Sequence, residues 1–296
     1  GHFVQSIELF DHAFFGMGAA EVKETDPNHR LVLEVGFSAL REGGYANKEQ
    51  LMGADVGMYL GFATTSDWGH IQAAKRTRFT PFSNHGGDPA AACGRVSYLL
   101  GLKGPCFVIN TACSSTLVAL NAACSDLRLG KTSGALVAGV NLQLHPGGWA
   151  GFCAMRALSP DGQCKTFDVN GNGFGRSDAC GAVHVRGSIG TQGDELDGGR
   201  PSPLVRIRGT FTNQDGKSAS FMAPNGTSQS ALIGACLHEA GADSTHRPGF
   251  VECHGTGTGL GDPIEVGALG RMFGNSATQS SPLLLGGVKT GIGHTE

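Results

Sequence analysis

Residues 106–130 read CFVINTACSSTLVALNAACSDLRLG, a run that indicates the fold class. Residues 106–110 predict a buried strand that runs directly into Cys113. The apolar residues that follow recur three or four positions apart, as on one face of a helix that ends near Gly130: Leu117, Leu120, Cys124 and Leu127. A strand joined at once to a helix is typical of layered α/β proteins.

The alternation of strands and helices continues on both sides of this stretch. Asp26 as an N-cap, with Pro27 at the first helical position, predicts a helix that ends near Gly43. Residues 64–89 predict an extended polar surface loop, and residues 187–203, rich in Gly, Asp and Pro, predict a long loop between two halves. Strands are expected at 56–60, 135–140, 183–185, 205–211, 250–253 and 283–288, and helices at 228–240 and from Asp262 onward.

The composition excludes several classes of protein. With 296 residues, 40% of them hydrophobic and 16% charged, the chain can bury a large core. Its formal charge of -3 gives no basic excess for a phosphate backbone or an anionic membrane surface. No apolar run reaches the roughly 18 to 20 residues that span a bilayer. We therefore expect neither nucleic acid nor a membrane as partner.

The nine cysteines are odd in number, scattered, and contain no C-x-x-C pair. This pattern predicts neither a disulfide framework nor a metal site. It indicates a reducing, intracellular compartment, the cytoplasm or alternatively a plastid, where most of these thiols act as small buried hydrophobes.

Cys113 occupies the junction of the predicted strand and helix. The unpaired N–H groups and the dipole of a helix N-terminus favour a thiolate, so this position indicates a nucleophile. The alternative is a structural core cysteine. Ser114 and Ser115 lack the flanking glycines of the G-x-S-x-G motif, which disfavours hydrolysis by serine.

Two histidines follow predicted strands. His254 lies in the run VECHGTGTGLGDP at 251–263, and His294 lies five residues after Lys289. The glycine spacing fits neither a dinucleotide fingerprint nor a P-loop. A lone histidine is usually structural, but two such histidines and a cysteine elbow fit a thioester site with a nucleophile and two hydrogen-bond donors.

Six ordered segments carry a family resemblance. The segment at 94–120, GRVSYLLGLKGPCFVINTACSSTLVAL, is similar to one that ends DTACSSSLVAL. The others are FFGMGAAEVKETDPNHRLVLEV (14–35), LSPDGQCKTFD (158–168), NQDGKS with APNG (213–226), VECHGTGTGLGDPIEVGAL (251–269) and VKTGIGHTE (288–296). Together they resemble β-ketoacyl synthases, in particular the ketosynthase domains of type I polyketide and polyunsaturated fatty acid synthases.

The resemblance implies an α/β, thiolase-like fold of two similar βαβ-rich halves in a layered αβαβα arrangement. Residues 1–187 would form the N-terminal half with the nucleophile, and residues 188–296 the start of the C-terminal half with the histidines. The chain begins inside the first family segment and stops inside the last. We therefore expect a ketosynthase domain incomplete at both ends, which on its own folds poorly and is inactive.

The resemblance also implies roles for single residues. Cys113 matches the acylated cysteine, and His254 and His294 match the two catalytic histidines. Lys289 matches the lysine that supports the second histidine. Asn110 stands where the family usually has Asp, Gly291 where it has Asn, and SDACG (177–181) where it has a G-E-G-C-G-like run. None of these departures removes a reacting group.

Thr256 and Thr258 match residues that would hydrogen-bond the phosphopantetheine arm of an acyl carrier protein, whereas Asp262 and Glu265 would organise their loop. The implied reaction transfers an acyl chain to Cys113 and condenses it with a decarboxylated malonyl-type extender. The domain itself would bind no cofactor, because its substrates arrive as phosphopantetheine thioesters. Expected partners are acyl carrier protein and acyltransferase domains and a second copy of the chain.

Two other interpretations remain open. The first is a related thioester enzyme, such as a thiolase or hydrolase. It is disfavoured because a thiolase would need a second catalytic cysteine near position 294, whereas His294 with Lys289 fits the decarboxylating subgroup. A non-catalytic scaffold that docks carrier protein is disfavoured because Cys113, His254 and His294 are all present.

Overall fold

The computed structural model describes residues 1–63, 67–187, 201–242, 248–274 and 282–296. Most of the long loop predicted at 187–203 therefore lies outside the described residues. The chain divides into two compact units. What we call the sheet unit comprises Phe3–Pro146, Asp178–Arg206 and Glu296, and what we call the histidine unit comprises Gly1–His2, Gly147–Ser177 and Ile207–Thr295.

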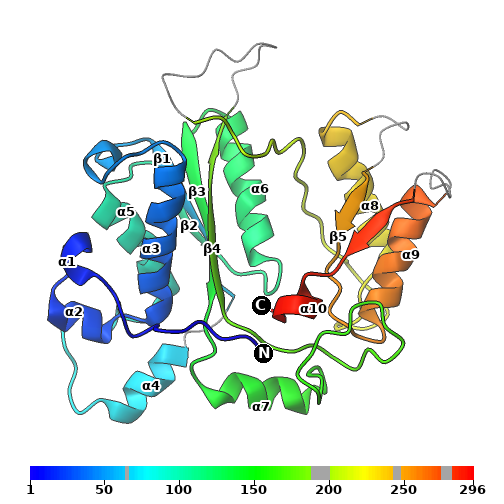
Figure 1. The fold of residues 1–296 in the computed structure, drawn as a ribbon, viewed down its shortest axis with the longest axis horizontal. Coiled ribbons are helices and arrows are strands. Elements are labelled where there is room, and N and C mark those ends of the chain that lie inside the picture. Colours follow the sequence, from blue (N-terminus) through cyan, green and yellow to red (C-terminus); the bar gives the residue numbers. More distant parts are fainter. Residues whose placement is uncertain (64–66, 188–200, 243–247, 275–281) are drawn as a thin grey trace. The chain divides into compact units, whose positions relative to one another are not determined.

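The sheet unit is built on a four-stranded mixed sheet with strand order β2-β1-β3-β4. The central strand β1 pairs in parallel with β2 and β3, so that Tyr59 lies opposite Phe107 and Val137, whereas β4 runs antiparallel to β3. Helices α3 (Pro27–Glu42) and α5 (Pro89–Leu100) cover one face of the sheet, and α6 (Ser115–Arg128) covers the other (Figure 1). The strands are β1 (Val56–Gly61), β2 (Cys106–Ile109), β3 (Gly134–Asn141) and β4 (Ala179–Arg186).

The helices of this unit include one that the sequence predicts with its cap. Asp26 accepts a hydrogen bond from the N–H of Asn28, and Pro27 begins α3, which confirms the predicted helix start. The full set is α1 (His12–Phe15), α2 (Ala19–Glu24), α3 (Pro27–Glu42), the 3-10 turn η1 (Glu49–Leu51), α4 (Asp67–Lys75), α5 (Pro89–Leu100) and α6 (Ser115–Arg128).

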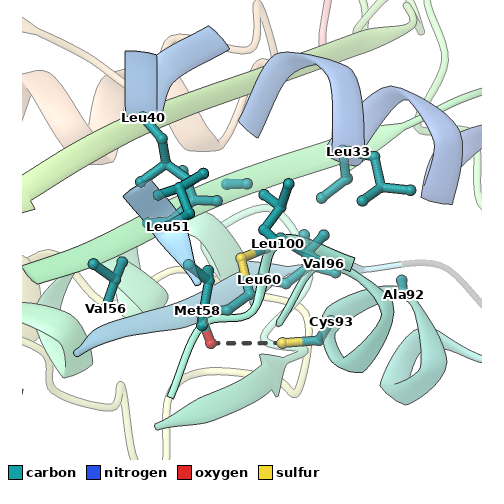
Figure 2. Packing of buried hydrophobic residues seen from close by; sticks show 14 of the residues in the cluster. Leu33, Leu40, Leu51, Val56, Met58, Leu60, Ala92, Cys93, Val96 and Leu100 are labelled. Atoms are coloured by element: carbon teal, nitrogen blue, oxygen red, sulfur yellow. Dashed lines mark hydrogen bonds between the residues drawn. The ribbon is translucent and has the colours of Figure 1, made fainter. Parts of the chain in front are cut away.

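The core lies on both faces of β1 and β3, because every residue of β1 is buried. Met58 and Leu60 point into the cluster formed with α3 and α5, which Figure 2 shows from close by. Tyr59 points to the opposite face, where it packs with Ala119 and Ala123 of α6. Helices on both faces therefore bury β1 completely, and α6 packs against β1, β2 and β3.

Two details of this region differ from the prediction. The strand expected to be buried, β2, lies at the edge of the sheet in the described part of the chain, and its Cys106 and Phe107 are exposed. Helix α6 exists as predicted, but Leu117 is 70% exposed and Ala119 and Ala123 form its buried face. Small side chains face the sheet because α6 lies so close to it that larger ones would not fit.

Two further predictions are wrong. Residues 67–75 form α4 instead of an extended loop, because Trp68 Nε1 donates to the C=O of Glu24 at 2.8 Å and Arg76 pairs with its carboxylate at 3.2 Å. These tertiary contacts at the end of α2 hold a helix that has no strong apolar pattern. The alternation at 205–211 gives no strand, because Val205 is 77% exposed and the segment pairs with no strand in the described residues.

The histidine unit contains a parallel pair of strands, with Val251 opposite Leu285. Helices α8 and α9 pack on each other, and Phe273 and Leu269 of α9 form a small core with Cys253. The strands predicted at 250–253 and 283–288 and the helix predicted at 228–240 are confirmed. The elements are α7 (Pro146–Ala154), α8 (Gly226–Glu239), β5 (Phe250–Glu252), α9 (Gly261–Phe273), β6 (Leu284–Gly286) and α10 (Lys289–Ile292).

Candidate active site

Cys113 lies in the turn between β2 and α6, as predicted. The chain reverses direction at Ala112, whose φ of 54° is in the left-handed region. Ser114 is the N-cap of α6, and the Cys113 residue is exposed. A thiolate at this point lies beside the N-terminus of a helix of 14 residues, where the helix dipole stabilises negative charge.

Side chains around Cys113 fix the shape of this turn. Ser115 Oγ accepts a hydrogen bond from the N–H of Thr111 at 2.9 Å and donates to the C=O of Ala112 at 2.6 Å. Asn110 Oδ1 accepts from the N–H of Ala112 at 3.1 Å, and its Nδ2 donates to the C=O of Ala63 at 3.1 Å. A carboxylate at position 110 could accept the first bond but could not donate the second, so the Asn that departs from the family pattern adds a tie to the segment after β1.

Close packing of α6 on the sheet sets the position of the turn. A Cβ added to Gly61, the last residue of β1, would lie 2.5 Å from the backbone nitrogen of Thr116. A Cβ added to Gly139 of β3 would clash with the Thr116 side chain. Glycine at these two positions allows the first turn of α6, and with it Cys113, to approach the sheet.

His254 follows β5 and is held by its backbone. The two carboxylate oxygens of Glu265, on α9, accept hydrogen bonds from the N–H groups of His254 at 2.6 Å and Gly255 at 2.9 Å. Gly255 has a φ of 47°, a left-handed value that turns the chain back over α9. A charged acceptor bonded to two adjacent N–H groups makes a rigid support for the His254 side chain.

Asp262 organises the rest of the same loop. It is 7% exposed, and its carboxylate accepts hydrogen bonds from the N–H groups of Gly257 at 3.2 Å and Phe167 at 2.8 Å. Thr256 and Thr258 lie within this loop with their hydroxyl oxygens 3.2 Å apart. The structure thus gives Asp262 and Glu265 the loop-organising contacts that the family resemblance implies for them.

His294 is buried and is bonded on both sides of its backbone. Its N–H donates to the C=O of Gly175 at 2.7 Å, and its C=O accepts from the N–H of Ser177 at 2.9 Å. The His294 ring lies edge-on to the His254 ring, with centroids 5.6 Å apart, and its centroid lies 5.1 Å from that of Phe174. Two histidines that are 40 positions apart in sequence therefore meet within one unit.

Both imidazoles are held neutral. Desolvation, followed by the charges of Lys289, His254 and Arg176, lowers the pKa of His294 to about 3. Desolvation and the charge of Lys289 also lower the pKa of His254, although part of that residue remains exposed to water. A neutral imidazole offers one N–H donor and one acceptor nitrogen, so the pair can donate hydrogen bonds to an oxyanion without losing a proton.

The structure brings together five of the six predicted site residues in the histidine unit: His254, His294, Lys289, Thr256 and Thr258. The sixth, Cys113, lies in the sheet unit. Lys289 begins α10 and acts on both imidazoles through its charge. Sequence reasoning missed Phe174 and Arg176, because nothing in the local pattern of 174–176 indicates contact with a histidine more than a hundred positions away.

Neither a metal site nor a membrane span occurs in the part of the chain that the structure describes. The described residues contain no group of three or more His, Cys, Asp or Glu side chains arranged to hold a metal ion. Among the helices described, none is both long enough and apolar enough to cross a bilayer.

Comparison with known proteins places this arrangement in a family. The β-ketoacyl synthase N-terminal domain family matches residues 1–187, and the β-ketoacyl synthase C-terminal domain family matches residues 204–296. The chain is 41% identical over 296 residues to a phenolphthiocerol/phthiocerol polyketide synthase of Mycobacterium tuberculosis, covering all of this chain and 15% of that protein. It is 38% identical over 291 residues to a highly reducing polyketide synthase of Aspergillus sclerotiorum, covering 98% of this chain and 11% of that protein.

Solved structures agree with the sequence matches. The ketosynthase from module 6 of the bacillaene synthase of Bacillus subtilis 168 is 35% identical, with a TM-score of 0.82 over 99% of this chain and 49% of that one. The oxazolomycin ketosynthase domain from Streptomyces albus JA3453 is 30% identical, with a TM-score of 0.86 over the same shares of each chain. The expected thiolase-like α/β fold is thereby confirmed. The chain belongs to the β-ketoacyl synthase family.

Proposed function

We propose that this protein is a β-ketoacyl-acyl carrier protein synthase of polyketide or fatty acid biosynthesis. The observation that carries the proposal is the pair of imidazoles of His254 and His294, with ring centroids 5.6 Å apart, in a chain whose Cys113 directly precedes the N-cap of α6. The chain spans only 15% of the length of the mycobacterial relative, so any activity of the whole protein is part of this proposal.

In the first step, the Cys113 thiolate attacks the thioester carbonyl of an acyl chain on a carrier protein. The new C–S bond to Cys113 forms as the bond to the carrier sulfur breaks, and the carrier leaves as a thiolate that takes up the proton released when Cys113 ionised. The N-terminal dipole of α6 favours the attacking thiolate, and the exposure of Cys113 gives the carrier access to it.

In the second step, a malonyl-type thioester loses carbon dioxide. The C–C bond to the carboxylate breaks, and its electron pair moves into an enolate whose oxygen is negative. The N–H groups of neutral His254 and His294 would donate to that oxygen, and desolvation around His294 strengthens such bonds. A protonated histidine is not needed, which fits the lowered pKa of both rings.

In the third step, the enolate carbon attacks the acyl-Cys113 carbonyl. A C–C bond forms, the C–S bond breaks, and Cys113 returns as a thiolate. The product is a β-ketoacyl thioester, two carbons longer when the extender is malonyl. Lys289, whose charge lowers the pKa of both histidines, would keep them neutral through the cycle.

The substrates would be carried on the phosphopantetheine arm of an acyl carrier protein. Thr258 is the better placed of the two loop threonines to reach such an arm, because it is half-buried whereas Thr256 is 7% exposed. Thr256 would then orient the Thr258 hydroxyl through their 3.2 Å contact. We also propose acyltransferase domains as partners and assembly as a homodimer. We further propose an intracellular location, which fits nine cysteines that are all present as thiols.

The first test is mass spectrometry of the full-length protein incubated with an acyl carrier thioester. We expect an acyl adduct on Cys113 that is absent from Cys113→Ala and unchanged in Cys153→Ala, which alters another exposed cysteine. The second test is release of carbon dioxide from a malonyl carrier thioester. His254→Ala and His294→Ala are expected to retain the adduct and to reduce this release to a small residual rate.

Each failure has a distinct meaning. A wild-type protein that binds carrier but forms no adduct would be a docking scaffold. An adduct on another residue would overturn the assignment of Cys113. Adduct formation without any release of carbon dioxide would exclude a decarboxylating condensation.

A further inference from the structure

Arg176 is a buried cation enclosed by aromatic rings of α7. The residue is 2% exposed, and its guanidinium carbon lies 5.2 Å from the ring centroid of Trp149 and 5.0 Å from that of Phe152. A Cβ at Gly148 would come within 2.7 Å of Arg176 Nη1, so glycine leaves the space that the guanidinium occupies. Stacking of a planar cation on two rings stabilises it in a site that is largely removed from water.

The same segment holds the backbone of His294. Arg176 and His294 form a parallel β-bridge, in which Gly175 accepts from the N–H of His294 and Ser177 donates to its C=O. Both polar backbone groups of His294 are therefore bonded to the residues that flank Arg176. Displacement of Arg176 from its aromatic slot would move this pair of bonds and the histidine with them.

A second contact chain joins α7 to the His294 ring. The rings of Phe152 and Phe174 lie 5.6 Å apart, and those of Phe174 and His294 lie 5.1 Å apart. Phe152 thus contacts both Arg176 and Phe174, and the Phe174 ring in turn contacts that of His294. Residues next to Arg176 therefore hold the backbone of His294 by hydrogen bonds, and Phe174, which contacts Phe152, packs against its ring.

We propose that Arg176 is a positioning residue for His294, which anchors segment 175–177 to Trp149 and Phe152 so that the imidazole keeps its place beside His254. The inference rests on the proposed function, since it assigns Arg176 to the decarboxylation step. It does not involve the transfer of an acyl group to Cys113.

The charges around the two imidazoles give the expected sign of a pH effect. Lys289, His254 and Arg176 all disfavour a proton on His294, whereas the carboxylates of Glu265 and Asp262 act on His254 in the opposite sense. Removal of the Arg176 charge therefore makes His294 easier to protonate. The acidic limb of a pH profile governed by His294 moves to higher pH in a variant without that charge.

The test compares Arg176→Met, Arg176→Lys and the control Arg271→Met, which alters an exposed arginine of α9, in the full-length protein. Arg176→Met is expected to lower carbon dioxide release from a malonyl carrier thioester roughly 10- to 100-fold, because a small misplacement of a catalytic group has this cost. Acylation of Cys113 should stay within about twofold. Arg176→Lys keeps the charge without the planar stacking, so it should recover the pH profile but only part of the rate.

A double-mutant cycle distinguishes positioning from general stability. In a His294→Ala background, Arg176→Met should change carbon dioxide release by less than about twofold, because the group that it positions is gone. Equal losses in acylation and decarboxylation, or losses that multiply in the His294→Ala background, would show a purely structural role and overturn the proposal.

A substrate-independent measurement separates this inference from the proposed function. In an NMR titration of ring-labelled histidines, assigned with His294→Ala, the His294 pKa should rise in Arg176→Met and stay in place in Arg271→Met. If the wild-type protein neither acylates nor decarboxylates, the proposed function fails, and this titration still decides whether Arg176 acts on His294. An unchanged His294 titration in a folded Arg176→Met variant would overturn the proposed role of Arg176.

Discussion

Glu265 holds His254 by the backbone: its carboxylate bonds the N–H of the histidine itself at 2.6 Å and that of the next residue, Gly255, at 2.9 Å. The Glu265 carboxylate thus acts as a clamp on the backbone of the loop, and these two bonds do not involve the His254 imidazole. A change in Glu265 should therefore affect the geometry of the histidine pair without altering the set of reacting groups.

Glu265→Gln tests this clamp. The amide keeps one oxygen acceptor but presents an NH2 group to the second backbone N–H, where two donors now face each other. Loss of one charge-assisted bond of about 1.5–3 kcal/mol should lower carbon dioxide release by at least tenfold. Acylation of Cys113 should be unaffected. Glu42→Gln, at an exposed position at the end of α3, is the matched control, and an equal effect of both variants would refute the clamp.

Gly61→Ala tests the packing that places the cysteine turn. The added Cβ would lie 2.5 Å from the Thr116 backbone nitrogen, so α6 must move. We expect a loss of about 1–3 kcal/mol in the free energy of unfolding and slower acylation of Cys113. Gly94→Ala in α5 is the control, because a Cβ there meets no atom within 4 Å and should slightly stabilise the helix. Acylation at the wild-type rate in Gly61→Ala would contradict this account.

Tyr59→Phe tests a polar contact beneath α6. The buried Tyr59 donates its hydroxyl to Asp126 Oδ2 at 2.8 Å, and Lys131 bonds the other oxygen at 2.9 Å. Removal of the hydroxyl should lower the free energy of unfolding by about 1 kcal/mol. Tyr98→Phe, at a tyrosine that is 83% exposed, should have no measurable effect. Equal midpoints of urea unfolding for the two variants would show that the bond adds nothing.

His29 gives the sheet unit a pH-dependent stability. The residue is fully buried, and desolvation and the charge of Arg95 lower its pKa to about 3. Because the unfolded chain protonates it near the ordinary value of about 6.5, the stability that neutral His29 contributes is complete above that pH and is lost as the pH falls toward 3. The slope is up to about 1.4 kcal/mol per pH unit.

Urea unfolding at pH 7, 6 and 5 measures this effect. His29→Gln should show a shallower decline in the free energy of unfolding than wild type, whatever its absolute stability. His85→Gln, at an exposed histidine of the same unit, should keep the wild-type slope. A His29→Gln slope equal to that of wild type would argue against a titrating His29.

Local chemistry explains which elements the sequence predicted well. The cap at Asp26 with Pro27, and the polar residues that end β2 and begin α6, act within a few positions of the chain. Their physical causes are present in any short window of the sequence. The helix at 67–75 and the exposure of Leu117 depend instead on Glu24 and on the glycines of β1 and β3, which lie far away along the chain.

The candidate site shows the same division. The residue types and the strand context of His254 and His294 predict two donors, and the family resemblance adds their roles. Their neutral state could not be predicted, because it arises from desolvation and from the charge of Lys289 in the folded protein. Arg176 was missed for the same reason, since its contacts with Trp149 and Phe152 exist only after α7 packs.

The left-handed residue Ala112 gives the turn before α6 its shape, and the side chains of Asn110 and Ser115 secure it through backbone hydrogen bonds. The residues that hold this turn in shape are therefore the neighbours of Cys113 and not Cys113 itself. Other nucleophiles or inert side chains can therefore be installed at position 113 on an unchanged scaffold. Comparison of Cys113→Ser with Cys113→Ala then measures the intrinsic reactivity of a hydroxyl at position 113. A selenol introduced there would report the electrostatic field at the N-terminus of α6 through its pKa.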